Sequence, residues 1–317
     1  MKIAFLTTWN VRCGIASYTQ FLTDALVKQG HEVTILCQYD LKDNKEDFGE
    51  GYNVVKCFEW YGMNNKVKFD IDLINKVTKG YDIFHIQYES FLYHKSYLDG
   101  IFGRLTNPVQ MVVTHHSSCT GSDCPVRWSA NICHDEDFPQ MENRYVLPMG
   151  IPDLSPVKNI PEGNTFGSFG LARNNDALCK QILGKLNEGG FECQYETHYG
   201  SSKWVPMDEL AKTIQKWRAI VLLYPPTDAN VSSSAVCVAI GTGIPVICTD
   251  TRWFQHAKDF VHLITTPTEL EFLLGKYLSG DEAWWADHRQ KVEKALDERS
   301  WDTMAKKHIE IYQTITR

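Results

Sequence analysis

Three consecutive serines, Ser232–Ser234, stand directly before an apolar segment and are suited to holding a phosphate group. They follow Ala219–Tyr224, an apolar run typical of a buried strand. Backbone N–H groups at a helix start bind anions with help from the helix dipole, and serine hydroxyls add further donors. Plain N-capping of the helix is the alternative role of these serines. A strand-to-helix turn at this point favours the diphosphate site.

A second strand-to-helix turn lies near the N-terminus. Lys2–Thr8 is typical of a buried strand, and Gly14–Ser17 opens the helix that follows. Gly14 either lets the backbone approach a donor phosphate or an acceptor, or only permits a tight turn. One such turn in each half predicts two nucleotide-fold domains that close on a ligand between them.

Basic side chains follow the expected strand ends in the second half. Arg173 comes shortly after Phe166–Gly170, where a strand is expected to end. Ligands bind at the carboxyl ends of parallel strands, so a guanidinium there would hold a diphosphate and neutralise charge on a departing nucleotide. Lys203, in Gly200–Lys203, is a second phosphate candidate. A solvated surface position is the alternative for Arg173.

Candidates for binding hydroxyl groups follow two strands of the first half. His116 follows the expected strand Gln110–Thr114 and is suited to hydrogen-bonding a transferred group or orienting an acceptor hydroxyl. His115 is the register alternative, because a one-residue slip exchanges the buried and exposed faces. Glu89 is either a ligand for acceptor hydroxyls or a solvated loop charge.

Two groups of residues consist of types that can bind metal ions. The first is a set of thiols and imidazoles, His115, His116, Cys119, Cys124, Cys133 and His134. Zinc binds such groups, but four residues separate Cys119 from Cys124 and no second close pair follows, which favours unligated buried cysteines. The second, Asp70–Asp72, begins an amphipathic segment, which favours first-turn charge on a helix. We therefore expect no metal ligand.

Composition limits the class of protein. The 317 residues, 43% of them hydrophobic, suffice for two globular domains. No stretch reaches the roughly 18 uninterrupted apolar residues of a membrane span, so we expect no transmembrane anchor. Ten cysteines without a secretory signal favour reduced thiols and a cytoplasmic location. A net charge of −7 does not favour a nucleic-acid partner, although it leaves a local basic groove open.

Strand-like and helix-like segments alternate, which is typical of α/β folds with mostly parallel sheets. In the first half we expect a helix at Ser17–Gln29 and strands at Lys2–Thr8, Glu32–Cys37, Val54–Phe58, Ile83–Gln87, Gln110–Thr114 and Ala130–Cys133. In the second half we expect strands at Thr165–Phe169, Phe191–Glu196, Ala219–Tyr224 and Pro245–Thr249, and helices at Asp176–Asn187, Met207–Trp217, Ser233–Gly241 and within Asp281–Thr314. Three prolines in Pro152–Pro161 predict the linker.

Four segments together resemble the GT-B glycosyltransferases, and within them the retaining family 4, including short members such as those of phages. The segments are Gly14–Tyr18 with the following Gly30–Thr34, Asp82–Glu89, Val113–His116, and Tyr224–Asp250 with its Gly243-Ile-Pro-Val-Ile ending. The resemblance implies a GT-B fold, in which two Rossmann-like doubly wound domains face each other across a cleft. We expect an acceptor-side domain at residues 1–155 and a nucleotide-sugar-binding domain with C-terminal helices at residues 156–317.

The chain departs from the family at two glutamates that lie eight positions apart. Aligned on Gly243, those positions hold Asn230 and Val238. Asn230 can still hydrogen-bond a sugar hydroxyl, whereas Val238 cannot bond a ribose. Arg173 matches the family's arginine, while Asn174 or Asn175 stands where the family has lysine.

The resemblance implies a metal-independent transferase that moves a sugar from a nucleoside-diphosphate donor, most simply a UDP-sugar, with no further cofactor. It implies catalytic roles for His116 and Asn230, and donor contacts from Gly14, Arg173 and Ser232–Ser234. Lys203 remains a phosphate candidate from its position in the sequence alone. Glu89 would bind the acceptor, which is a glycan, a lipid, a small molecule or a hydroxymethylated DNA base. The alternative is a sugar- or nucleotide-binding protein without catalysis, favoured by the loss of the glutamate pair.

Overall fold

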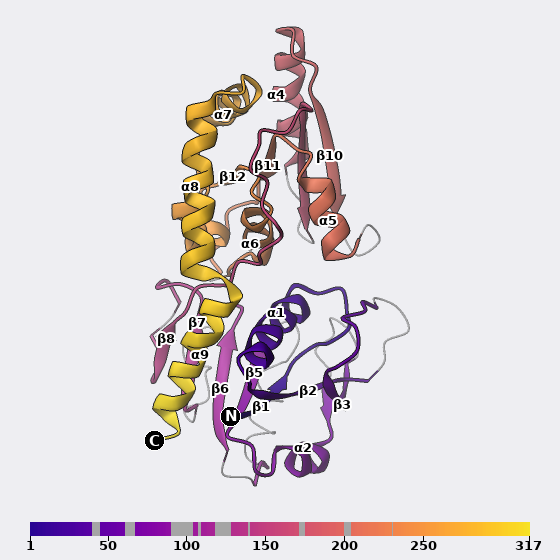
Figure 1. The fold of residues 1–317 in the computed structure, drawn as a ribbon, viewed down its shortest axis with the longest axis vertical. Coiled ribbons are helices and arrows are strands. Elements are labelled where there is room, and N and C mark those ends of the chain that lie inside the picture. Colours follow the sequence, from indigo (N-terminus) through magenta and orange to yellow (C-terminus); the bar gives the residue numbers. More distant parts are fainter. Residues whose placement is uncertain are drawn as a thin grey trace. The chain divides into compact units, whose positions relative to one another are not determined.

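The computed structural model describes residues 1–39, 45–60, 67–89, 104–106, 109–117, 128–138, 140–170, 175–199, 204–229 and 231–317. These residues form two compact units (Figure 1). Unit 1 contains Met1–Pro148, Ala229–Val231 and Trp301–Arg317, and unit 2 contains Met149–Asp228 and Ser232–Ser300. As compact bodies, the units differ from the expected ranges 1–155 and 156–317 chiefly because the last helix belongs to unit 1.

Unit 1 contains an eight-stranded sheet in the order β4-β3-β2-β1-β5-β6-β7-β8. Only β4 runs antiparallel to its neighbour. The strands are β1 (Lys2–Leu6), β2 (Glu32–Gln38), β3 (Asn53–Trp60), β4 (Val67–Phe69), β5 (Ile83–Tyr88), β6 (Gln110–His115), β7 (Ala130–Cys133) and β8 (Arg144–Val146). All six strands expected in this half are confirmed, while the short β4 and β8 were not predicted.

Alternate residues of β5 face opposite sides of this sheet. Phe84 and Ile86 belong to a buried apolar cluster that also includes Ile74 of helix α2 (Ile71–Thr78). His85 and Gln87 therefore face the other side. That side is covered by α1 (Gly14–Lys28), which begins three residues earlier than expected.

The final helix, α9 (Trp301–Ile315), packs against α1 within unit 1. The Trp301 ring meets the edge of Tyr18 with centroids 4.8 Å apart. Further along the helix, the Tyr312 hydroxyl lies 2.5 Å from Nδ1 of His85 on β5. These contacts explain why residues 301–317 belong to unit 1.

Unit 2 contains a fully parallel sheet in the order β10-β9-β11-β12-β13. Its strands are β9 (Thr165–Gly170), β10 (Gln194–Tyr199), β11 (Ala219–Leu222), β12 (Val246–Thr249) and β13 (His262–Ile264). Four of them were expected. Strand β10 begins three residues later than expected, because the Asn187 side chain bonds both backbone groups of Cys193 and holds that stretch in a turn.

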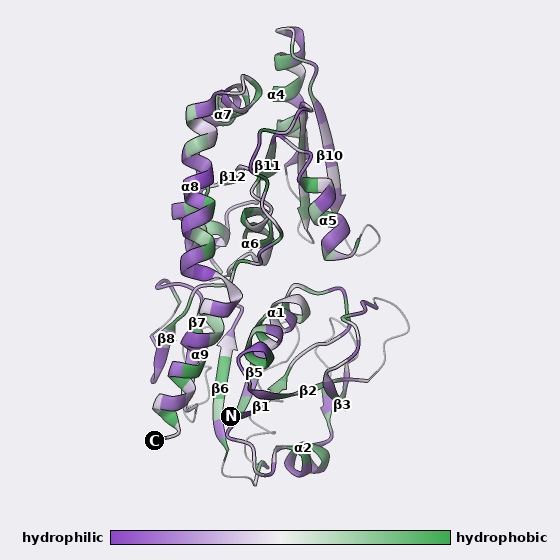
Figure 2. Ribbon diagram, viewed as in Figure 1, coloured by the Kyte–Doolittle hydropathy of each residue, from purple (hydrophilic) through white to green (hydrophobic). Residues whose placement is uncertain are grey.

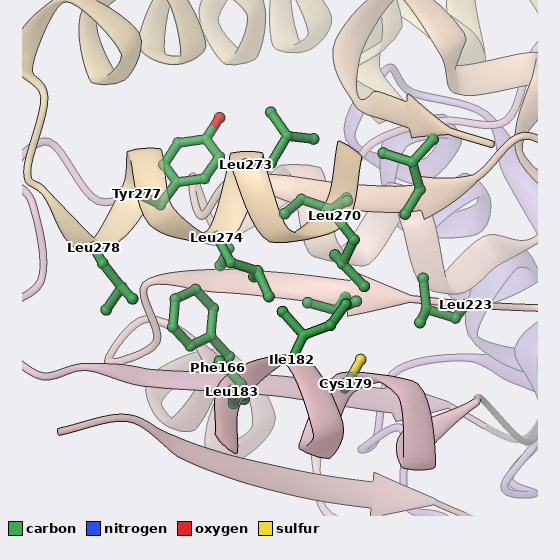
Figure 3. Packing of buried hydrophobic residues seen from close by; sticks show 14 of the residues in the cluster. Phe166, Cys179, Ile182, Leu183, Leu223, Leu270, Leu273, Leu274, Tyr277 and Leu278 are labelled. Atoms are coloured by element: carbon green, nitrogen blue, oxygen red, sulfur yellow. The ribbon is translucent and has the colours of Figure 1, made fainter. Parts of the chain in front are cut away.

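The described helices of unit 2 are α4 (Asp176–Glu188), α5 (Met207–Ile214), α6 (Ser234–Gly241), the 3₁₀ helix η4 (Arg252–Phe260), α7 (Pro267–Leu278) and α8 (Glu282–Arg299). Helices α4 and α7 share one buried cluster with the strands (Figure 3). Helix α8 is mainly hydrophilic (Figure 2). Its buried positions, Trp285, His288, Val292 and Ala295, recur at helical spacing, so one face packs inward.

The expected helical tail is two helices that meet at Ser300. Ser300 has an extended conformation, with φ −55° and ψ 152°, and pairs with Ile151 in an isolated parallel bridge. The Ile151 N–H also donates to the Arg299 carbonyl at 2.7 Å. The chain that follows unit 1 therefore interrupts the helix.

The glycine of the fourth family-like segment has a packing role. Gly243 has a φ of +78°, and a Cβ there would lie 2.6 Å from the backbone nitrogen of Val157. The expected linker segment thus passes directly over this turn. Only glycine permits both the positive φ and the close approach. No described helix is long and apolar enough to cross a bilayer.

Candidate functional site

Each sheet has a switch point, where the strand order changes direction along the chain. In unit 1 it lies between β1 and β5, and in unit 2 between β9 and β11. Doubly wound sheets bind ligands at the carboxyl ends of the strands at such points. Gly14 and Glu89 follow the two strands in unit 1, and Ser232–Ser234 follow β11 in unit 2. The predicted residues thus lie at the expected sheet edges.

The start of α6 is not capped by a serine side chain. Ser233 is the N-cap residue and is only 7% exposed, yet its hydroxyl makes no capping hydrogen bond. That hydroxyl instead bonds the Tyr224 side chain, and burial raises the pKa of Tyr224 to about 12. The Ser233 N–H donates to the Trp253 carbonyl at 3.0 Å. Ser233 is therefore not the plain side-chain N-cap that the sequence offered as an alternative role.

Other helices of the chain do use side-chain caps. The capped starts are those of α2, α4, α7 and α8, whose caps are Asp70, Asn175, Thr266 and Asp281. Helix α1, with Cys13 at the N-cap, and α5, with Pro206, resemble α6 in lacking one. Cysteine and proline offer no good acceptor, whereas the serine at α6 has one and directs it elsewhere.

The carboxyl end of β9 lies beside the first turn of α6. A Cβ on Gly170, whose φ is +125°, would approach the Tyr224 hydroxyl to 3.1 Å and the Ala235 Cβ to 3.7 Å. After residues 171–174, the Asn175 N–H donates to the Leu223 carbonyl at 3.1 Å. Both flanks of residues 171–174 are therefore held beside the carboxyl ends of β9 and β11.

A cavity of about 470 Å³ opens at the carboxyl ends of β11, β12 and β13 within unit 2. Its lining is largely apolar, with a few hydroxyl and amide groups: Asn175, Leu178, Leu223, Tyr224, Pro225, Pro226, Thr249, Ile264, Thr265, Thr266 and Pro267. The Thr249 hydroxyl donates to the Tyr224 carbonyl at 2.8 Å. Apolar walls with a few fixed polar groups are typical of sites for flat organic rings.

His116 is buried in unit 1 and has a protein partner at each ring nitrogen. Its Nδ1 lies 3.2 Å from Nε2 of His134, and its Nε2 lies 2.8 Å from the Gln87 side-chain oxygen. His134 Nδ1 lies 3.2 Å from the Leu147 carbonyl oxygen. Burial lowers the pKa of His116 well below the usual value, and neighbouring histidines lower it further. His116 is therefore neutral at pH 7 and fully hydrogen-bonded.

Glu89 lies beside the residue that follows His116. The Ser117 hydroxyl donates to Glu89 Oε1 at 2.7 Å. Ser117 also pairs with Val231 in an isolated antiparallel bridge. The structure thus brings Glu89 and the segment just before the serine triplet together at one point of unit 1.

His115, the register alternative, has a different set of contacts. Its Nε2 lies 2.9 Å from the Asn131 side-chain oxygen on β7, and its ring meets Tyr88 edge-on at 5.7 Å. Tyr88 belongs to the apolar cluster on the α2 side of the sheet. His115 and His116 therefore point to opposite faces, and only His116 lies on the side covered by α1.

Several predicted residues lie outside the described part of the chain, namely Asn230, Arg173, Lys203, Cys119 and Cys124. Their roles stay predictions. Within the described ranges no group of three or more His, Cys, Asp or Glu residues could hold a metal ion. Asp70 caps α2 through a hydrogen bond from the Leu73 N–H, and Asp72 lies in its first turn, as the sequence indicated.

The sequence did not single out Gln87, Tyr224 or Tyr18. Gln87 is fully buried on β5 and bonds His116. Tyr224 bonds Ser233, and Tyr18 packs edge-on against His116 at 4.8 Å. Gln87 could have been found as the polar residue inside an otherwise apolar strand, because a buried amide needs a hydrogen-bond partner.

No protein-family model matches the chain, and no curated protein matches it. Solved structures do. An alpha-glucosyltransferase in complex with UDP and a 13-mer DNA has a TM-score of 0.66 and 13% identity, with 100% of this chain and 99% of that chain covered. Anabaena Alr3699/HepE, in complex with UDP and glucose, has a TM-score of 0.68 and 11% identity, with 99% and 100% covered.

The lipopolysaccharide outer core galactosyltransferase WaaB has a TM-score of 0.63 and 12% identity, with 99% of each chain covered. These similarities extend over both units. The chain therefore has the GT-B glycosyltransferase fold, built from two Rossmann-like α/β domains, which confirms the fold class expected from the sequence.

Proposed function

We propose that this protein is a cytoplasmic glycosyltransferase that moves a sugar from a nucleoside-diphosphate sugar to an acceptor hydroxyl. UDP-sugars are the proposed donors, because structurally similar glycosyltransferases bind UDP. Following family 4, the proposed transfer retains the anomeric configuration and needs no metal. The departing phosphate then helps to deprotonate the acceptor, and the protein contributes positioning and charge stabilisation.

The observation that carries this proposal is the start of α6, which follows β11 at the switch point of unit 2 and has no side-chain cap. Backbone N–H groups of such a turn suit a diphosphate, and Ser232 and Ser234 add hydroxyls. Arg173 lies between Gly170, which is close to Tyr224 and Ala235, and Asn175, whose N–H donates to the Leu223 carbonyl. In the proposal, Arg173 and Lys203 neutralise the diphosphate and Gly14 lets the backbone approach the donor.

The cavity at the carboxyl ends of β11, β12 and β13 supports a nucleotide as the ligand. Its apolar walls and its position at the carboxyl ends of β11–β13 suit the heterocyclic base. Val238 is buried on α6 and offers no polar group, so ribose contacts would come from the chain elsewhere. This differs from the glutamate that the family has at that position.

On the acceptor side, the proposal gives Glu89 and His116 contacts to hydroxyl groups, and Asn230 a contact to the transferred sugar. Glu89 is held by Ser117, which pairs with Val231, the neighbour of Asn230. The acceptor class is open among glycans, lipids, small molecules and hydroxymethylated DNA bases. The net charge of −7 does not favour DNA, although three similar structures of an alpha-glucosyltransferase contain it.

The test is incubation of the purified protein with a panel of nucleotide sugars, with nucleotide release measured over time. Slow hydrolysis with one UDP-sugar, accelerated by the right acceptor class, is the expected result. The rival function is a sugar or nucleotide binder without catalysis, for which Asn230 and Val238 in place of the glutamates are the motivation. Binding of UDP-sugars without any release would establish that rival.

Arg173→Ala tests the diphosphate contact separately. We expect weaker UDP binding and slower turnover, because a charge-assisted bond to phosphate is lost. Lys185→Ala, which removes a half-exposed lysine on α4, is the control for loss of positive charge. Unchanged donor affinity and turnover in Arg173→Ala would remove this residue from the site.

A further inference from the structure

A backbone carbonyl determines which atom donates and which accepts in each hydrogen bond around His116. The Leu147 carbonyl can only accept, so His134, whose Nδ1 lies 3.2 Å away, carries a proton on Nδ1. Burial lowers the pKa of His134 to about 4, so the ring is neutral at pH 7 and its Nε2 can only accept. His116 Nδ1, 3.2 Å from that atom, therefore donates.

The far nitrogen of His116 then carries a lone pair. A neutral ring with its proton on Nδ1 needs a donor at Nε2, and the neighbour at 2.8 Å is the Gln87 amide. With the Gln87 oxygen facing His116, the Gln87 nitrogen is buried without a partner. Amide oxygen and nitrogen are told apart only by their hydrogen bonds. Turning the amide over gives His116 its donor and pairs the buried nitrogen.

His115 is held in the opposite way, although it is the next residue toward the N-terminus. The Asn131 amide nitrogen donates to the Glu142 carbonyl at 2.8 Å, which fixes the orientation of that amide. The Asn131 oxygen therefore faces His115 Nε2 at 2.9 Å and accepts a proton from it. His115 is thus protonated on Nε2 and His116 on Nδ1. In each case a backbone carbonyl fixes the neighbouring side chain, Asn131 or His134, and that side chain determines which nitrogen carries the proton.

Packing holds this arrangement in place. Gln87 and His134 are fully buried and His116 is 6% exposed. The Tyr18 ring meets His116 at 4.8 Å and His134 at 5.5 Å, and Trp301 of α9 backs Tyr18. The titratable groups around His116 are His134, His85 and His115, and Glu89 is reached through Ser117. Burial lowers the pKa of His134 and His85, so both rings are neutral at pH 7 and neither competes as a cation for the lone pair on His116.

We infer that Gln87 and His134 are positioning residues that hold His116 with its proton on Nδ1 and a lone pair on Nε2. The consequence for catalysis rests on the proposed function. In that reaction His116 is a hydrogen-bond acceptor, and the Gln87 amide occupies the lone pair until a sugar or acceptor hydroxyl takes its place. His116 then orients a hydroxyl and does not serve as a general acid.

Nitrogen NMR of the whole ¹⁵N-labelled chain at pH 7 tests the assignment directly. Long-range proton–nitrogen correlations distinguish protonated from unprotonated ring nitrogens. We expect protonated Nδ1 and bare Nε2 on His116 and His134, and protonated Nε2 on His115. A neutral His116 with its proton on Nε2 would overturn the inference.

His134→Phe removes the acceptor that fixes the proton of His116. The proton should then move to Nε2, where the Gln87 oxygen accepts it. His115→Phe is the matched control, since it changes the neighbouring ring and should leave the His116 proton on Nδ1. The spectrum of the unaltered chain decides the assignment even if His134→Phe does not fold.

Turnover separates this inference from the proposed function. With an active donor, His134→Phe should lower kcat about 100-fold, because a misoriented contact loses that much, while the affinity for UDP stays within twofold. Unchanged kcat in a folded His134→Phe variant would overturn the positioning role. Absence of turnover in the unaltered chain, together with the expected spectrum, would overturn only the proposed function.

Discussion

The two sheets differ in how the polar groups at the carboxyl ends of their strands are satisfied. In unit 1 the His116, His134 and Gln87 side chains bond one another and are almost fully buried. In unit 2 the start of α6 lacks a side-chain cap, and a largely apolar cavity of about 470 Å³ opens at the carboxyl ends of β11, β12 and β13. The first edge is held by side-chain hydrogen bonds within the protein, whereas the helix start at the second has no side-chain cap and is the proposed diphosphate site.

The largest expected difference between the units is in the stability that each loses at acidic pH. Among the described residues, unit 1 buries four histidines whose pKa is lowered, His85, His116, His134 and His308, whereas unit 2 has two, the part-buried His262 and the buried His288. In each case the folded pKa lies below the ordinary value of 6.5, so the unfolded chain takes up protons first as pH falls. The contribution of these histidines to the free energy of unfolding is therefore fully present above about pH 6.5 and is lost progressively as the pH falls below that value.

Between pH 6.5 and its folded pKa, each such histidine lowers the free energy of unfolding by about 1.4 kcal/mol per pH unit. We expect unit 1 to lose stability roughly twice as steeply as unit 2. Amide hydrogen exchange at pH 7 and pH 5, corrected for intrinsic rates, measures protection in each unit separately. Equal losses in the two units would contradict this contrast.

A carboxylate at the start of α6 tests whether that edge is reserved for an anion. Ser234→Glu should weaken UDP binding about 100-fold through like-charge repulsion, while leaving the free protein slightly more stable, because the helix dipole favours the new charge. Calorimetric titration and a thermal melt give the two readouts. Ala283→Glu, at an exposed first-turn position of the capped helix α8, is the control and should leave UDP affinity unchanged.

Two glycines sharpen the comparison of the strand-to-helix turns. Gly170→Ala should cost about 1–2 kcal/mol, because the left-handed conformation and the close Tyr224 hydroxyl both oppose a side chain. Gly14→Ala should be neutral or slightly stabilising, since Gly14 is the first helical residue of α1. Urea unfolding measures both. Loss of UDP affinity in a stable Gly14→Ala variant would show close approach of the donor.

The smallest effect concerns capping. Asp70→Ala removes the cap of α2 and should cost about 1 kcal/mol. Ser234→Ala should cost only a few tenths, since a half-buried side chain without a cap role is lost. Matched urea unfolding curves measure the difference. A larger cost for Ser234→Ala than for Asp70→Ala would mean that the serine stabilises the helix start itself.

The sequence predicted the strands well because buried parallel strands are short apolar runs, as in Ile83–Tyr88 and Ala219–Leu222. It missed β4, β8 and β13, each of three residues, since so short a strand has no readable period. The place of α9 also escaped it, because the partners of Trp301 and Tyr312 are hundreds of residues away.

Within the candidate site, the sequence predicted the local motifs but not which side chains bond one another. The serine triplet and His116 were found from their positions after expected strands. The partnership of His116 with Gln87 depends on the register of β5 against β6, and that with His134 on the adjacent β7. The hydroxyl of Ser233 could be expected to cap a helix, but only the fold reveals that Tyr224 takes it.

The return of α9 to unit 1 has a consequence for synthesis on the ribosome. The indole of Trp301 and the phenol of Tyr312 emerge only after every residue of unit 2 has been translated. Until then the ring of Tyr18 and the imidazole of His85 lack their covering partners. The portion made first therefore completes its folding last, and a nascent chain halted near Ser300 would expose that uncovered face to chaperones.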